Sequence, residues 1–378
     1  MYGVDYNFVG KKINRGWGKR GAGKVRWLKY IALMVGVGVL LVALSQQENP
    51  WAMEKPLREL ASKAAIEVGT AVSSRLLLSD ESYRKKVEEE FSVITPENEM
   101  KWESVEPRQG VYSWDQADLL VKFAQLNQQK VRGHTLVWHN QLPSWLKEET
   151  FSAAELRDLL KHHIQVLVAR YKGAIWQWDV VNEAFNDDGS FRDTIWYRAF
   201  NGPDYIAMAF RWAKEADPSA LLFYNDYNLE FPGPKAKAVL SFLTRLRAEG
   251  VPIDGIGFQG HISLRYGFPN ATELLQHVKA FIDAGFYVSF TEVDVRMPLP
   301  RDGVKDLAQA QVYSQLFSTC LALRPKCLSF TIWGFPDKYS WVPGFFPGEG
   351  AATPFDDDYS PKPAYHQMRL LLSLGSGK

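Results

Sequence analysis

Short apolar runs alternate with longer amphipathic segments from about residue 57 to residue 372. The short runs have the length of buried strands, whereas the longer segments carry apolar residues at helical spacing. The predicted strands are Ile66–Val72, Ser92–Thr95, Val131–Trp138, Trp176–Asn182, Leu221–Asn225, Ile253–Gln259, Tyr287–Glu292 and Leu328–Gly334. The predicted helices are one that begins near Leu57, then Tyr83–Phe91, Gln116–Asn127, Ala153–Tyr171, Tyr205–Ala216, Lys235–Glu249, Thr272–Ala284 and Ala308–Leu323.

Strand and helix patterns that alternate eight times predict a parallel sheet with helical crossovers. Eight such units suit a closed (β/α)8 TIM barrel, which needs roughly 250 residues and is frequently longer. The alternative is an open doubly wound sheet. That fold would ordinarily carry a Gly-rich phosphate loop after its first strand, and the sequence has none. We therefore expect an α/β protein with one (β/α)8 domain over residues 57–372.

Polar side chains gather where the predicted strands end, which is where a barrel of this kind builds its site. The two runs that end in Glu183 and Glu292 each pass directly from buried-type residues into a carboxylate. The residues at these ends are Glu97, Asn98, Lys101, His134, Trp138, His139, Gln141, Asn182, Glu183, Asn225, Asp226, Tyr227, Gln259, His261, Glu292, Asp294, Trp333, Asp337 and Trp341.

This mixture of carboxylates, amides, imidazoles and indoles fits a sugar polymer. Amides, Lys and His bind hydroxyl groups, and indole faces cover the apolar faces of pyranose rings. Two opposed carboxyl groups can cleave the bond between two sugars. A single Glu at a strand end is more commonly an ion-pair partner, so the prediction depends on the pair.

Several conspicuous residues favour ordinary structural roles. The spacing of His134 and His139 places them on opposite faces of a strand, so we expect no metal. His162-His163 lies in an amphipathic helix and is predicted to be at the surface, whereas Trp196 and Trp212 are predicted core residues.

Six segments, in this order, closely resemble glycoside hydrolase family 10, the endo-β-1,4-xylanases. They are Thr95–Trp102 (TPENEMKW), Gly133–His139 (GHTLVWH), Trp178–Ala184 (WDVVNEA), Gln259–His261 (QGH), Thr291–Asp294 (TEVD) and Trp333-Gly334 through Ser340-Trp341. The similarity extends from about Ala61 to about Met368. It implies a (β/α)8 barrel that hydrolyses xylan with retention of configuration and without a cofactor. One departure is Val293, where Leu is frequent in the family.

The resemblance also implies roles for individual residues. Glu183 resembles the general acid/base, and Glu292 resembles the nucleophile. Asn182 is similar to the residue that holds the sugar 2-hydroxyl, and His261 with Asp294 to the pair that supports the nucleophile. The residues that resemble substrate-binding positions are Glu97, Asn98, Lys101, His134, Trp138, Gln141, Gln259, Trp333 and Trp341 on the glycone side, with Tyr227 and Asn228 on the aglycone side.

A retaining mechanism leads to two further expectations about Glu183 and Glu292. Their carboxyl groups should lie ~5–5.5 Å apart. At that distance the charge on Glu292 should disfavour ionisation of Glu183, which would then stay protonated for the first step.

Two rival functions fit the same cleft. A cellulase or mixed-linkage glucanase would need room for the exocyclic CH₂OH of glucose, which bulky rings such as Trp333 and Trp341 can deny. A non-catalytic glycan-binding protein would be expected to lack one catalytic carboxylate, yet both are present. We expect xylan and xylo-oligosaccharides as partners, and a monomer.

Charge is distributed unevenly along the chain. Residues 1–29 hold eight basic residues against Asp5, which leaves 36 basic and 42 acidic residues for the remainder. A mildly acidic domain lacks the footprint of a nucleic-acid binder. The basic segment is followed by the apolar residues 30–45 and a linker at residues 46–56. This order predicts an export signal, and hence an extracellular or periplasmic protein. An uncleaved membrane anchor is the alternative, because the basic segment is long for a signal.

Only two cysteines occur, Cys320 and Cys327. Export would permit a disulfide between them, and closing so short a loop would stabilise the fold by ~2–3 kcal/mol. The alternative is two unpaired buried thiols. In the resembled family, many members bridge the last helix to strand eight at these positions. With no further thiols, metal binding is not expected.

Overall fold

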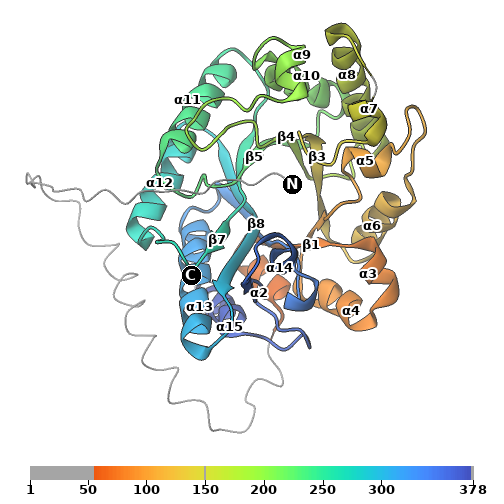
Figure 1. Ribbon diagram of the computed structural model, residues 1–378. Helices are drawn as coiled ribbons and strands as arrows, with labels where there is room; N and C mark the ends of the chain where they lie inside the picture. The colour runs from red at the N-terminus through yellow and green to blue at the C-terminus, as the bar shows by residue number, and fades with distance from the viewer. Residues whose placement is uncertain (1–54, 149, 376–378) are drawn as a thin grey trace, which may run out of the picture. The chain divides into compact units, whose positions relative to one another are not determined.

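The computed structural model describes residues 55–148 and 150–375 (Figure 1). The predicted basic segment 1–29, the apolar segment 30–45 and all but the last two residues of the linker 46–56 lie outside the described residues. Within the described ranges, no helix combines the length and the apolar character needed to cross a membrane.

Eight parallel strands close into a barrel, so the predicted fold is confirmed. Each strand pairs with its neighbour in chain order, and β9 pairs with both β8 and β1 to complete the circle. The barrel strands are β1 Glu67–Val72, β2 Val93–Pro96, β3 Lys130–Val137, β4 Gln177–Asn182, β5 Leu221–Asp226, β6 Gly255–Phe258, β8 Tyr287–Pro298 and β9 Cys327–Ile332.

Long helices form an outer ring around the strands (Figure 1) and bury their apolar faces against them. They are α4 Glu81–Glu90, α6 Asp115–Leu126, α8 Ala153–Arg170, α10 Asp204–Ala216, α11 Pro234–Ala248, α12 Ala271–Asp283, α13 Gly303–Ala322 and α15 Pro363–Gly375. The shorter α2 Leu57–Lys63 packs against β1, α4 and α15. Side chains that cap the N-termini determine where several of these helices begin. Ser152 and Glu155 form a capping box on α8, and Asn270 accepts two N–H groups at the start of α12.

Short elements not predicted from the sequence lie in the loops around the barrel. They are α3 Ser74–Ser79, α5 Trp102–Val105, α7 Ser144–Glu148, α9 Ile195–Ala199, the 3₁₀ helix η2 Asp337–Tyr339 and α14 Val342–Phe345, with strands β7 His261–Ser263 and β10 Glu349–Gly350. β8 also continues beyond its predicted end to Pro298. This extension pairs in parallel with β7 and antiparallel with β10.

Two glycines are required by close packing inside the barrel. A Cβ atom on Gly133 would lie 2.2 Å from the ring of Trp178, and one on Gly257 would lie 2.2 Å from Oδ1 of Asn225. The absence of a Cβ atom at Gly257 matters for the site, because it leaves room for the Asn225 side chain between strands β5 and β6.

The prediction that His162-His163 lies at the surface is wrong for His163. Its ring stacks on Trp102 with centroids 3.8 Å apart and is almost fully buried. Burial lowers the pKa of His163 to about 3, so the ring packs as a neutral aromatic. Trp196 and Trp212 are core residues, as predicted.

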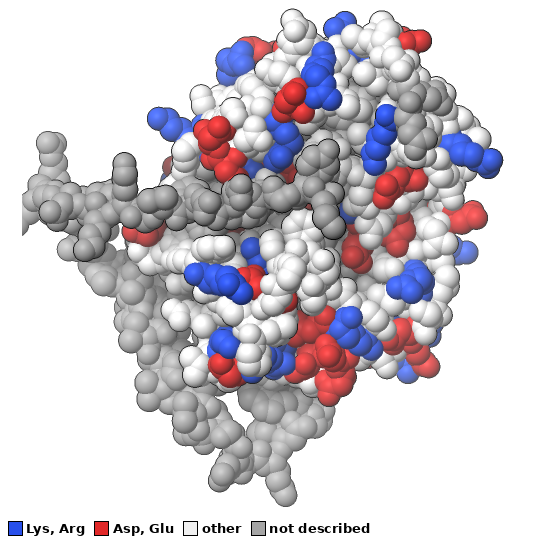
Figure 2. Space-filling view, viewed as in Figure 1, with Lys and Arg blue, Asp and Glu red and all other residues white. Residues whose placement is uncertain are grey.

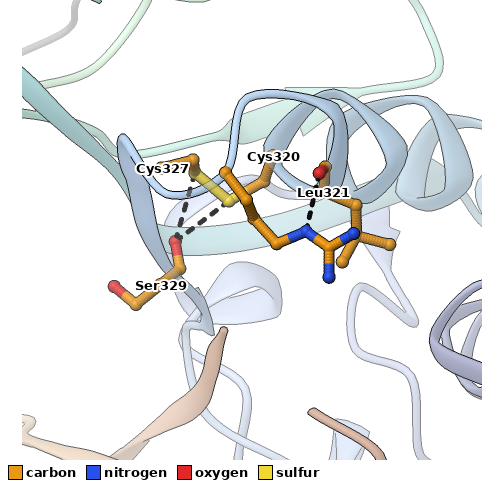
Figure 3. The surroundings of a disulfide bond; sticks show 5 residues. Cys320, Leu321, Cys327 and Ser329 are labelled. Carbon is orange, nitrogen blue, oxygen red and sulfur yellow. Dashed lines mark hydrogen bonds between the residues drawn. A yellow bond between two sulfur atoms is a disulfide. The ribbon is translucent and has the colours of Figure 1, made fainter. Parts of the chain in front are cut away.

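Cys320 of α13 and Cys327 at the start of β9 form a disulfide (Figure 3). Both sulfurs lie near the carbonyl oxygen of Ser329, at 3.6 and 3.9 Å. The bridge therefore ties the last crossover helix to the N-terminal end of the last barrel strand.

That end of the barrel also carries a cavity of about 710 Å³. Its lining includes Lys130, Trp176 and Cys327, which start or precede strands, together with Pro56 and Arg58. The chain therefore enters the barrel at the end from which the strands begin.

On the face seen in Figure 2, basic and acidic residues of the described chain are interspersed.

Candidate active site

The carboxyl ends of the strands bring the two expected carboxylates into one network of side chains. Glu183 directly follows β4, with φ +58°, and Glu292 lies within β8. Both belong to the rim from which Asn182, Asn225 and Gln259 also project. These five residues lie on or directly after four strands, β4, β5, β6 and β8, so only the folded barrel brings them together.

Two side chains form hydrogen bonds with Glu292, and the ring of His134 lies nearby. Asn225 Nδ2 lies 2.7 Å from its Oε1, and His261 Nε2 lies 3.2 Å from its Oε2. His134 Nδ1 lies 3.8 Å from Oε1 and is itself 3.0 Å from Asp179 Oδ2. Glu292 is 5% exposed, so these neighbours enclose its carboxylate and fix its orientation.

His261 bridges Glu292 and Asp294. Its Nδ1 lies 2.8 Å from Asp294 Oδ2, which also accepts from Trp341 Nε1 at 2.8 Å. Burial alone would lower the pKa of His261, but Asp294 and Glu292 outweigh it and raise the pKa to about 10. At neutral pH the ring is therefore an imidazolium that donates to both carboxylates.

Glu183 accepts three hydrogen bonds, two from residues that follow β3 and β6 and one from the residue before it in the chain. Trp138 Nε1 donates to Oε2 at 2.9 Å. Gln259 Nε2 and Asn182 Nδ2 each donate to Oε1 at 3.1 Å. These donors fix the carboxyl group and satisfy its negative charge.

The expectation that Glu183 would resist ionisation is wrong in direction. Burial does raise its pKa, but nearby His139, the bonds from Gln259 and Trp138, and Lys235 together lower it below the ordinary value. The pKa of His139 is lowered to about 4 by burial.

Asn182 and Asn225 connect the two sides of the cleft. Asn225 Nδ2 lies 2.9 Å from Asn182 Oδ1, which also accepts from Gln259 Nε2 at 3.2 Å. Thr291 Oγ1 donates to Asn225 Oδ1 at 2.7 Å. A continuous set of amide groups thus runs from Glu183 to Glu292.

A buried lysine organises the predicted glycone side. Lys101 Nζ donates to Gln141 Oε1 at 2.6 Å and to Asn98 Oδ1 at 2.9 Å. It lies 5.1 Å from the ring of Trp138 and 6.0 Å from that of Trp333. Burial lowers the pKa of Lys101, whereas Glu292 and other nearby carboxylates oppose the change.

Two further predicted residues border this cluster. The ring of Trp333 lies 5.3 Å from that of His134. Burial and Glu99 raise the pKa of Glu97, although Lys101 opposes them.

The predicted aglycone-side residues form a separate group. Arg192 Nη2 donates to the Tyr227 hydroxyl at 2.8 Å, and Asn228 Nδ2 donates to Asp187 Oδ1 at 3.3 Å. Lys235 Nζ lies only 3.4 Å from the centre of the Tyr227 ring. One face of this ring is therefore covered by a cation, which leaves the other face and the edge for a ligand.

The structure adds residues that the sequence reasoning did not assign to the site. Asn225 and His139 stood at predicted strand ends but received no role, although their position was a usable signal. No such signal marked Asp179, Arg192 or Lys235. Each of them contacts a site residue that is distant in the sequence, and only the fold brings the two side chains together. Within the described ranges, no group of three or more His, Cys, Asp or Glu residues is placed to hold a metal.

The comparisons with known proteins agree with this geometry. The family model described as glycosyl hydrolase family 10 matches residues 56–370. Endo-1,4-beta-xylanase B of Thermotoga neapolitana is 43% identical over 337 residues, which cover 88% of this chain and 96% of that protein. Endo-1,4-beta-xylanase C of Phanerodontia chrysosporium is 40% identical over 313 residues, which cover 82% of this chain and 77% of that protein.

A solved structure shows the same similarity in three dimensions. The crystal structure of xylanase 10B from Thermotoga petrophila RKU-1, in complex with xylobiose, superposes with a TM-score of 0.82 at 42% identity. The match covers 86% of this chain and 99% of that chain.

Proposed function

Since the chain belongs to glycosyl hydrolase family 10, we propose that it is an endo-1,4-β-xylanase that cleaves internal bonds of xylan by a retaining double displacement. The observation that carries the proposal is the pair of Glu183 and Glu292, each held by its own donors and joined by Asn182 and Asn225. Relatives named as endo-1,4-β-xylanases support the substrate.

In the first step, Glu292 attacks the anomeric carbon while Glu183 gives its proton to the departing glycosidic oxygen. The carbon–oxygen bond breaks, and a covalent glycosyl-enzyme forms on Glu292. In the second step, the ionised Glu183 takes a proton from water, and the water oxygen displaces Glu292 from the carbon. The expected separation of the two carboxyl groups, ~5–5.5 Å, belongs to this mechanism.

The charged partners fit the two roles. The imidazolium of His261 donates to Glu292 and orients its carboxylate for the attack. Glu183 must begin as an acid, although its pKa is lowered in the open cleft. A sugar bound over it removes solvent and strengthens the effect of burial, which favours the protonated form.

The remaining residues serve binding. Asn182 is positioned for the sugar 2-hydroxyl, with Asp294 supporting His261. Glycone-side binding is assigned to Glu97, Asn98, Lys101, His134, Trp138, Gln141, Gln259, Trp333 and Trp341, and aglycone-side binding to Tyr227 and Asn228. The partners are xylan and xylo-oligosaccharides.

The decisive test is Glu292→Ala on an activated aryl β-xylobioside. Activity should fall by several orders of magnitude, because the nucleophile is gone. Added azide should restore turnover and give the inverted α-glycosyl azide, since a small anion can occupy the vacated space. The product is identified by NMR.

Two controls accompany this test. Asp193→Ala removes an exposed carboxylate and should leave activity unchanged. Wild-type enzyme should release reducing sugar from xylan and far less from carboxymethyl-cellulose. Substantial activity of Glu292→Ala without azide would refute the assignment.

We also propose that the enzyme is exported, because a basic segment precedes the apolar residues 30–45. Sequencing the N-terminus of the mature protein from fractionated cells distinguishes a cleaved signal from a retained anchor.

A further inference from the structure

A break between β6 and β7 serves both catalytic carboxylates. Gln259 and Gly260 occupy this break, and His261 starts β7. The Gln259 side chain donates to Glu183 at 3.1 Å, and His261 Nε2 lies 3.2 Å from Glu292. Three consecutive residues therefore place a donor on each carboxylate, so the path of this backbone sets both distances.

The backbone at the break is fixed by hydrogen bonds on two sides. The N–H of Glu292 donates to the Gln259 carbonyl at 2.9 Å, and the N–H of Asp294 donates to the Gly260 carbonyl at 3.3 Å. On the β5 side, the N–H of Gln259 donates to the Asp226 carbonyl at 3.1 Å, and the N–H of Gly260 donates to Oε1 of Glu230 at 2.6 Å. The bond to Glu230 is the one that a side chain supplies.

Glu230 lies in the loop between β5 and α11 and is fully buried. Its other oxygen, Oε2, has no hydrogen-bond partner within residues 55–148 and 150–375. Burying a carboxyl group with so few partners is unfavourable. An apolar residue of similar volume would serve packing alone at least as well, so the acceptor at Gly260 is the feature that distinguishes Glu230.

The surroundings of Glu230 agree with this view. Burial raises its pKa to about 7, although backbone N–H groups, His261 and Lys235 oppose the change. On the α12 side, His277 Nε2 contacts the carbonyl of Leu229 at 2.7 Å. The loop that carries Glu230 is thus anchored independently of the break, and it provides a firm base for the bond to Gly260.

We propose that Glu230 is a positioning residue that holds the backbone of Gln259–His261 and so aligns both catalytic carboxylates. The inference rests on the proposed function. Because both carboxylates depend on the break, losing this acceptor should slow formation and hydrolysis of the glycosyl-enzyme together. A residue that supported only one carboxylate would slow one step alone.

The test compares Glu230→Gln with Glu230→Met at pH 5.5, where the wild-type carboxyl is largely protonated. Gln keeps an oxygen acceptor for Gly260, whereas Met has similar volume and no acceptor. We expect Glu230→Met to lower kcat about tenfold or more with little change in KM, and Glu230→Gln to stay within about threefold of wild type. The loss should appear on xylan and on an activated aryl β-xylobioside alike.

Rates are expressed per competent site, counted from the burst of phenol released by 2,4-dinitrophenyl β-xylobioside. Glu90→Met is the matched control, because buried Glu90 accepts from the N–H of Leu57 at 2.9 Å, where α2 begins. It should lower the melting temperature without changing kcat per competent site. If Glu230→Met does not fold, Glu230→Asp replaces it, since the shorter side chain withdraws the acceptor from Gly260.

The outcomes separate the two proposals. An active wild type with undiminished kcat per site in Glu230→Met, or in Glu230→Asp, overturns the role of Glu230 alone. An equal loss in Glu230→Gln overturns it too, because the acceptor would then be irrelevant. A wild type without xylanase activity overturns the proposed function and this inference with it.

Discussion

Asn225 illustrates how much a single amide can contribute at this site. Its Nδ2 lies 2.7 Å from Glu292 Oε1 and 2.9 Å from Asn182 Oδ1. We expect Asn225→Ala to lower kcat by about 10- to 100-fold, because a hydrogen bond to a charged group contributes ~1.5–3 kcal/mol. Steady-state kinetics on an aryl β-xylobioside measure the effect. Asn127→Ala, which removes a bond to a helix carbonyl, should change kcat little, and parity of the two variants would contradict the prediction.

The charge on His261 gives a prediction for stability. Its pKa is raised to about 10 from an ordinary 6.5, so the folded state binds the proton more tightly than the unfolded state. The resulting stabilisation, on the order of a few kcal/mol, is complete below about pH 6.5 and is lost as pH rises through 10. Denaturation from pH 6 to 10 should show wild type converging on His261→Gln, whose stability lacks this dependence.

Exposed His162→Gln serves as the control and should follow wild type throughout the range. A constant difference between wild type and His261→Gln at all pH values would mean that packing, not charge, accounts for the stabilisation.

At the scale of elements, the strand and helix patterns predicted the barrel, because buried parallel strands are apolar on both faces. The strand ends also predicted most of the side chains that the structure brings into contact around Glu183 and Glu292, because a polar residue after an apolar strand lies at the rim of the barrel. Predicted bounds differ from the observed ones by at most one residue for β1 to β5. The roles of individual site residues were implied by the six family motifs, because the spacing of apolar residues carries no information about chemistry.

The elements missed from the sequence are those stabilised by distant partners. β8 continues past its predicted end at Glu292, where β7 and β10 pair with the extension. His163 was misplaced because Trp102, sixty-one positions earlier, provides the ring on which it stacks. The pKa of Glu183 likewise depends on His139 and Lys235, which come from other strands and helices.

The disulfide between α13 and β9 can be tested as an isolated element. Removing it with Cys320→Ala/Cys327→Ala should lower the free energy of unfolding by ~2–3 kcal/mol, as expected for so short a loop. Activity at 25 °C should be unchanged, because the bridge lies at the strand starts, whereas the proposed catalytic residues Glu183 and Glu292 lie at the opposite end of the barrel. Chemical denaturation of the variant should match that of reduced wild type, and a drop in kcat would contradict the separation of the two ends.

At the scale of the whole molecule, residues 55–378 hold every strand that closes the barrel and every residue assigned to the site. We expect a chain truncated to these residues to fold cooperatively and to match the specific activity of the full chain on soluble xylan. Differential scanning calorimetry and reducing-sugar release measure the two properties. As a contrast, a chain truncated at residue 66 loses α2 and should unfold at a lower temperature. Loss of activity in the first truncation would show that the preceding residues contribute to the site.

The point at which the chain enters the barrel has a geometric consequence. Pro56 and Arg58 lie with the beginnings of the strands, whereas Glu183 and Glu292 lie where the strands finish. A tether attached before Lys55, natural or engineered, would therefore join the barrel at the end opposite Glu183 and Glu292. Immobilising the enzyme through that tether on a bead or a cell surface should leave the cleft turned outward, toward a solid polymer that cannot diffuse to it.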